Sequence, residues 1–87
     1  MHKIWKYPFG ISGNIIISMP KLARILDIQY QNGTLCMWAL VDDNDLIVNR
    51  FFTVIGTGHN IPDFSHGLEY IKTVQDGPYV WHIFEIK

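Results

Sequence analysis

Apolar and polar residues alternate along most of the chain, most clearly in segment 24–41, where two alternating runs meet at Asn32-Gly33. An Asn-Gly pair tolerates the two successive positive φ angles of a type I′ turn, so the pattern predicts a β-hairpin with a two-residue turn. This turn sets the register, and a slip by one residue would turn the apolar face to water. We therefore expect Tyr30 to face Leu35 and Ile28 to face Met37.

The same register assigns the two faces of the hairpin. It pairs Leu26 with Ala39 and Arg24 with Val41, and it predicts a core face of Leu26, Ile28, Tyr30, Leu35, Met37, Ala39 and Val41. The opposite face is polar near the turn, but at its far end Ile25, Trp38 and Leu40 cluster. We interpret this cluster as an interface with a partner, with a second layer of core as the alternative.

Five more segments are rich in β-branched and aromatic residues and are bounded by turn residues, at 2–9, 14–19, 46–55, 68–74 and 79–86. Nowhere do apolar residues recur with the period of an α-helix. The pattern predicts a single all-β domain over residues 1–87, a small barrel or sandwich of about six to seven mostly antiparallel strands. Residues 56–67 form the one long predicted loop.

Composition adds an expectation about partners. The 87 residues are 48% hydrophobic and 14% aromatic, with only 17% charged. A small domain has little interior in which to bury so much apolar surface, so we expect part of it to be covered in a homo-oligomer or by a partner.

Charge and cysteine content exclude several classes. The net charge is −1 and the seven lysines and arginines are scattered, which argues against a duplex-DNA-binding protein, since such proteins cluster basic residues at phosphates. A single cysteine, Cys36, excludes an internal disulfide framework and a multi-cysteine zinc site. The sequence shows no membrane span and no signal-peptide pattern, so we expect a cytoplasmic protein. We assign no cofactor.

Several motifs in fixed order resemble a known family. They are WKYP (5–8), MP (19–20), QxQxG (29–33), CxWALVD (36–42), GTGHxIP (56–62), YIxT (70–73) and VWHIFE (80–85). Together they resemble small proteins of about ninety residues that phages and prophages encode and whose domain has no assigned function. In that family MP usually precedes a glycine turn and YI often precedes Gly-Thr, whereas Lys21-Leu22 and Lys72 stand here. The resemblance implies a viral or prophage context and a compact β-rich domain, and it implies no catalytic residues. We therefore expect the cytoplasm in question to be that of the host cell.

The GTGH segment is the first candidate site. Gly56 and Gly58 flank Thr57, and such a turn can converge backbone amides into a nest for a phosphate or carboxylate. Thr57 adds a hydroxyl and His59 an imidazole that titrates near neutrality. The alternative interpretation is a bulge or tight turn that ends a strand, with His59 capping backbone groups.

Two further chemistries are weaker alternatives. His59, Asp63 and His66, joined by His82 or His2, could offer nitrogen and oxygen ligands to zinc, but the spacing matches no metal motif, so we assign no metal site. Cys36 lies in the middle of a predicted strand, where cysteines usually pack as small inert residues, and nothing in the sequence places a histidine beside it.

The tryptophans lie in three different predicted strands. Trp5, Trp38 and Trp81 fit core or interface positions, but an aromatic platform that stacks on a nucleotide base is the alternative. We therefore assign a ligand site to Gly56, Thr57, Gly58 and His59 at the phosphates of a nucleotide, with Trp38 or Trp81 at its base.

Three functions stay open, and the first is favoured. The chain is a phage accessory binding protein that sequesters a nucleotide-type host defence signal or inhibits a host protein. Alternatively, it is a small hydrolase that uses His59 with Thr57 or Asp63, or a structural virion or assembly component with contacts at Ile25, Trp38 and Leu40. An enzyme is the less favoured class, and we assign no catalytic residue.

Overall fold

The computed structural model describes residues 1–61, 63 and 67–87, and these residues form seven strands. The strands are β1 (His2–Phe9), β2 (Asn14–Pro20), β3 (Arg24–Gln31), β4 (Thr34–Asp42), β5 (Ile47–Gly56), β6 (Leu68–Asp76) and β7 (Tyr79–Ile86). Each predicted segment is a strand, and the bounds of β1 and β7 match the prediction. The all-β prediction is confirmed.

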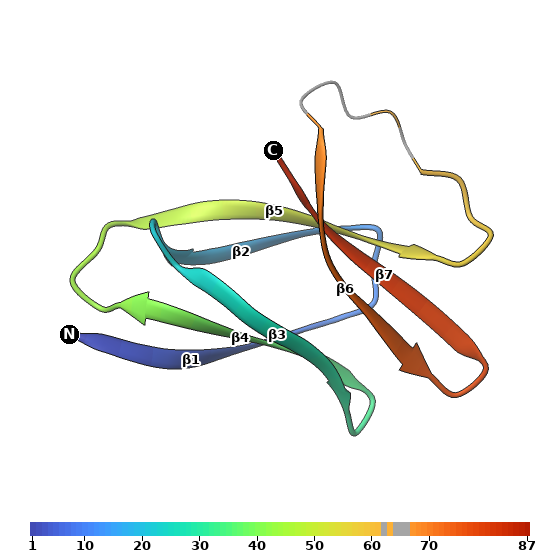
Figure 1. The fold of residues 1–87 in the computed structure, drawn as a ribbon, viewed down its shortest axis with the longest axis horizontal. Helices are drawn as coiled ribbons and strands as arrows, with labels where there is room; N and C mark the ends of the chain where they lie inside the picture. Colours follow the sequence, from blue (N-terminus) through green and yellow to red (C-terminus); the bar gives the residue numbers. More distant parts are fainter. Residues whose placement is uncertain (62, 64–66) are drawn as a thin grey trace.

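The strands form two antiparallel sheets, with orders β1-β4-β3 and β2-β5-β7-β6 (Figure 1). The chain crosses between the sheets three times, from β1 to β2, from β2 to β3 and from β4 to β5, before the β6–β7 hairpin ends it. Each sheet keeps its own edge strands, so the fold is a sandwich and the closed barrel offered as an alternative is wrong.

The Asn32-Gly33 hairpin is confirmed. Asn32 has φ 49° and Gly33 has φ 86°, as a type I′ turn requires. Near the turn, Tyr30 pairs with Leu35 and Ile28 with Met37, as the sequence predicts.

Farther from the turn the predicted register is wrong, because β3 carries a bulge between Ile25 and Asp27. The extra residue, Leu26, does not face Ala39 and is 46% exposed, whereas Ile25 takes its place opposite Ala39 and packs against the core. Arg24 accordingly pairs with Leu40 instead of Val41. A single bulge thus exchanges the faces that alternation assigns to residues 25 and 26.

The core lies between the two sheets. Its fully buried side chains come from both of them and include Ile28, Leu35, Met37, Met19, Phe52 and Ile83. The inward positions of β4 are apolar at every second residue, and Phe52 and Val54 continue this pattern in β5, which is why these strands place their side chains in one continuous core.

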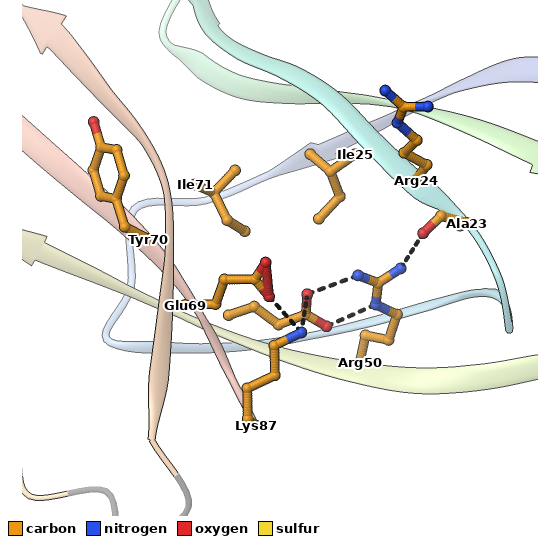
Figure 2. A pocket seen from close by; sticks show the side chains of 9 residues that line it. Ala23, Arg24, Ile25, Arg50, Glu69, Tyr70, Ile71 and Lys87 are labelled. Carbon is orange, nitrogen blue, oxygen red and sulfur yellow. Dashed lines mark hydrogen bonds and ion pairs between the residues drawn. The ribbon is translucent and has the colours of Figure 1, made fainter.

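The edge strands β3 and β6 lie next to each other, and each carries a bulge. In β6 the extra residue is Ile71, whose side chain lies beside that of Ile25 where the sheets meet (Figure 2). Next to Ile71, Lys72 reaches Asp27 of β3 at 2.9 Å. Bulges and charges of this kind protect an edge strand from pairing with another chain.

One buried hydroxyl group leads to a prediction about stability. Within the described residues the phenolic oxygen of Tyr7 is buried without a hydrogen-bond partner, and burial raises the pKa of this side chain. Tyr7→Phe removes the unsatisfied group, so we expect the free energy of unfolding to stay the same or to rise by about 1 kcal/mol. Urea unfolding measures it, with Tyr70→Phe as the control, because Tyr70 bonds Thr73 at 2.8 Å and gains nothing from the change. A clear loss of stability in Tyr7→Phe would show that the hydroxyl has a partner.

Candidate functional site

A cleft of about 240 Å³ opens between the end of β5 and the β6–β7 turn. Figure 1 shows both of these segments at the right. Its lining residues come from the GTGH segment and from the start of β7, namely Gly56, Thr57, His59, Pro78, Tyr79, Val80 and Trp81. Thus the fold brings together four of the residues that the sequence assigned to a ligand site, Gly56, Thr57, His59 and Trp81.

Backbone hydrogen bonds shape the GTGH segment into a tight turn. The amide of Thr57 donates to the carbonyl oxygen of Val80 at 3.2 Å, and the amide of His59 donates to that of Gly56 at 3.1 Å. Gly58 has φ 86°, a conformation that favours glycine. Because the amides of Thr57 and His59 already donate to backbone carbonyl oxygens, the turn offers less to a phosphate than a nest of converging amides would.

Gly56 is buried and makes room for the histidine. A Cβ atom at this position would lie 2.8 Å from Nδ1 of His59 and 3.2 Å from Cζ3 of Trp81. The absence of a side chain therefore lets the imidazole fold back over the strand, next to the indole. Any larger residue would push the imidazole away from Trp81.

Two aromatic rings form the other wall. Tyr79 and Trp81 are two residues apart on β7, and their rings stack with centroids 5.9 Å apart and planes 23° from parallel. The indole nitrogen of Trp81 donates to Oδ2 of Asp76 at 3.3 Å, which holds the ring in place. Tyr79 is 60% exposed, so the pair presents an open aromatic surface at the cleft.

A chain of hydrogen bonds leads away from the cleft across the outer face of β5, β7 and β6. Oγ1 of Thr57 lies 2.7 Å from Nε2 of His82, and Nδ1 of His82 lies 3.0 Å from Oγ1 of Thr73, which lies 2.8 Å from the hydroxyl of Tyr70. The sequence alone did not indicate that these four side chains meet. The registers of the two β-ladders determine which residues lie next to His82, since it pairs with Thr73 on β6 and with Ile55 on β5.

The remaining predicted ligand residue, Trp38, lies apart from this cleft. It belongs to the three-stranded sheet, where Nζ of Lys6 lies 5.7 Å from its ring centroid. Of the predicted interface cluster, Trp38 and Leu40 stay on the outer face of β4, but the bulge turns Ile25 toward the core. An interface there would thus have to use Trp38 and Leu40 without Ile25.

The metal and cysteine alternatives gain no support from the geometry. In the part of the chain that the structure describes, no group of three or more His, Cys, Asp or Glu side chains could hold a metal ion, and His66 of the hypothesised set lies outside that part. Cys36 is 3% exposed, and its Sγ lies 3.8 Å from the carbonyl oxygen of Thr34.

A second, larger hollow of about 410 Å³ lies where the ends of β3, β5, β6 and β7 meet (Figure 2). Arg50 donates through Nε and Nη2 to both carboxylate oxygens of Glu85 at 2.7 Å, and through Nη1 to the carbonyl oxygen of Ala23 at 2.5 Å. Lys87 contacts Glu69 at 2.6 Å and Glu85 at 3.5 Å. Because these charged groups pair with one another, we interpret the cluster as a structural salt-bridge network and not as a ligand site.

The pKa of Glu85 reflects its salt bridges with Arg50 and Lys87. Burial by itself raises the pKa of this carboxyl, but the hydrogen bonds and positive charge of Arg50, with a smaller contribution from Lys87, lower it below its ordinary value. The same pair raises the pKa of Arg50.

Comparison with known proteins gives a family but no function. No curated protein and no solved structure matches the chain. The described residues include no helix long and apolar enough to cross a membrane. One family model matches residues 1–87, and it describes a domain of unknown function, DUF7352. Because the match spans the whole sequence, the chain belongs to the DUF7352 family.

Proposed function

We propose that this protein acts by binding, and that its cleft takes the planar ring of a nucleotide-type small molecule. The observation that carries the proposal is the convergence of Tyr79, Trp81 and His59 on one cleft. Aromatic faces stack on any nucleobase, and such a contact contributes about 1–3 kcal/mol to binding.

The size and polarity of the cleft favour the base over the phosphates as the recognised group. A volume of 240 Å³ is below that of most drug-sized sites and suits a single heterocyclic ring. The hydroxyl of Thr57 and the imidazole of His59 can hydrogen-bond to the edge of that ring. No lysine or arginine is among the lining residues, so the phosphates would extend from the cleft toward solvent.

The resemblance to phage- and prophage-encoded proteins supports a biological setting for this activity. A small viral protein that binds a nucleotide can act as a sponge for a host defence signal, and we propose this role for the chain. Inhibition of a host protein is the second candidate, with the exposed side chains of the three-stranded sheet around Trp38 and Leu40 as the contact surface.

Titration with adenine nucleotides and cyclic nucleotides tests the proposal through tryptophan fluorescence, because Trp81 lines the cleft. We expect binding to quench the emission and Tyr79→Ala to weaken binding about tenfold, since one stacking face is lost. Tyr79 is 60% exposed, so the substitution should leave the fold intact.

Trp38→Phe is the matched control. It removes an indole on the other sheet, so the affinity should stay unchanged and the fractional quenching should increase as the background emission falls. If no nucleotide changes the fluorescence at millimolar concentration, or if Tyr79→Ala binds as tightly as the original chain, the cleft is not a nucleotide site.

A further inference from the structure

We propose that Thr57 and His82 form a nucleophile–base pair that accepts an acyl group from a small activated ester. The hydroxyl oxygen of Thr57 lies 2.7 Å from Nε2 of His82, a hydrogen-bond distance at which a histidine can remove the hydroxyl proton. The reaction needs no ligand in the cleft, so it can be tested independently of the proposed binding function.

The β-ladder explains why these two side chains meet. The amide of Thr57 donates to Val80, which continues the β5–β7 pairing one residue beyond Gly56. Thr57 therefore lies across from Val80, and its side chain projects on the same face of the sheet as His82, two residues farther along β7. The threonine is exposed, so an ester can reach its hydroxyl.

Thr73 and Tyr70 can accommodate the tautomer that catalysis requires. When Nδ1 of His82 carries the proton, it donates to Oγ1 of Thr73 at 3.0 Å, and the hydroxyl of Thr73 in turn donates to Tyr70 at 2.8 Å. Nε2 is then unprotonated and accepts the hydroxyl of Thr57. Thr73 thus acts as a positioning residue, in the place where a carboxylate stands in a Ser-His-Asp triad.

A donor for the developing oxyanion is available next to the nucleophile. The backbone amide of Gly58 directly follows Thr57 and makes no backbone hydrogen bond to another described residue. Apart from Gly58 itself and its two chain neighbours, no described residue has an atom within 4 Å of where a Cβ of Gly58 would stand, so the space around it is open. The amide after the nucleophile has this role in many acyl-transfer enzymes.

The chemical steps balance with water as the only co-reactant. Oγ1 of Thr57 attacks the ester carbonyl carbon while its proton passes to Nε2 of His82. The bond to the leaving alcohol then breaks, and the alcohol takes that proton, which leaves an acyl-threonine ester. Water attacks this ester, gives a proton to Nε2, and releases the carboxylic acid as the proton returns to Oγ1.

The neutral orienting group sets the expected rate. Replacing the carboxylate of a serine-protease triad by a neutral amide costs about 10⁴ in kcat, so a histidine oriented by Thr73 should catalyse slowly. We therefore expect a single-turnover acylation that is measured over minutes, in place of rapid turnover.

p-Nitrophenyl acetate tests the proposal. We expect release of p-nitrophenolate together with one acetyl group on Thr57, located by peptide mass spectrometry. Thr57→Val should abolish this labelling, His82→Asn should slow it about 10²-fold or more, and Thr57→Ser should retain it. Thr73→Val should move the pH profile of the reaction, because it removes the hydrogen-bond partner of Nδ1 of His82.

Ser18→Ala is the matched control. Its hydroxyl bonds Asn49 at 2.6 Å and lies near no histidine in the described hydrogen bonds, so labelling of Thr57 should be unchanged. Acetyl groups found only on lysines or the N-terminus would overturn the proposal. So would labelling of Thr57 that survives His82→Asn, or that is lost in His59→Ala while His82→Asn keeps it.

Discussion

Arg50→Met is expected to lower the free energy of unfolding by about 3 kcal/mol, because it leaves the carboxylate of Glu85 largely buried without its main partner. The Arg50 and Glu85 side chains are only 18% and 9% exposed, so water cannot replace the lost hydrogen bonds. Lys87 stays 3.5 Å from Glu85, which is why we place the loss at the low end for a broken buried pair. Urea unfolding followed by circular dichroism measures it.

The double variant Arg50→Met, Glu85→Leu distinguishes the cost of an unpaired buried charge from the cost of lost side-chain packing. It removes both charges and restores apolar contact, so most of the lost stability should return. Lys6→Met is the matched control, because Lys6 is exposed on the other sheet and its substitution should change stability by less than about 1 kcal/mol. A double variant as unstable as Arg50→Met would show that the guanidinium contributes mainly through its bond to Ala23.

The same pair predicts how stability depends on pH. The folded state keeps Glu85 ionised at pH values where the unfolded chain, with an ordinary pKa of 4.5, already takes up a proton. Stability from this group is therefore complete above pH 4.5 and is lost as pH falls through the lower folded pKa. Asp27, Asp42 and Asp43 also have lowered pKa values, so the double variant should flatten the acid limb without abolishing it.

Phe52→Ala is expected to cost about 4 kcal/mol, enough to unfold much of a domain of this size. Phe52 is 0% exposed and lies in the centre of the core between the two sheets. Removing the ring creates a cavity that the surrounding strands cannot close, because their ladders hold them at a fixed spacing.

Phe51→Ala is the matched control, since the two phenylalanines are neighbours on opposite faces of β5. Phe51 is 46% exposed on the outer face, and its loss should cost no more than about 1 kcal/mol. Thermal unfolding of both variants measures the difference. Equal losses would mean that the outer face of the four-stranded sheet is covered as well, as a second subunit would do.

The sequence by itself determined the strands and most of their faces. Alternation with a period of two is a local property, so it identified seven strands, the Asn32-Gly33 turn and the inward positions of β4. Arg50 stands two residues before Phe52, so alternation puts both on one face, and Arg50 reaches the buried Glu85 in the structure.

Only the tertiary structure decided which side chains lie next to each other. No local pattern announces the bulge at Leu26, because an extra residue is accommodated by pairing with β4 and by the contact with β6. Which side chain stands beside Thr57 depends on ladders that join residues far apart in sequence, and so does the pairing of Arg50 with Glu85. The separation of Trp38 from Trp81 has the same origin. Assignment of a strand to one sheet or the other is a property of the whole core, which a two-residue period does not encode.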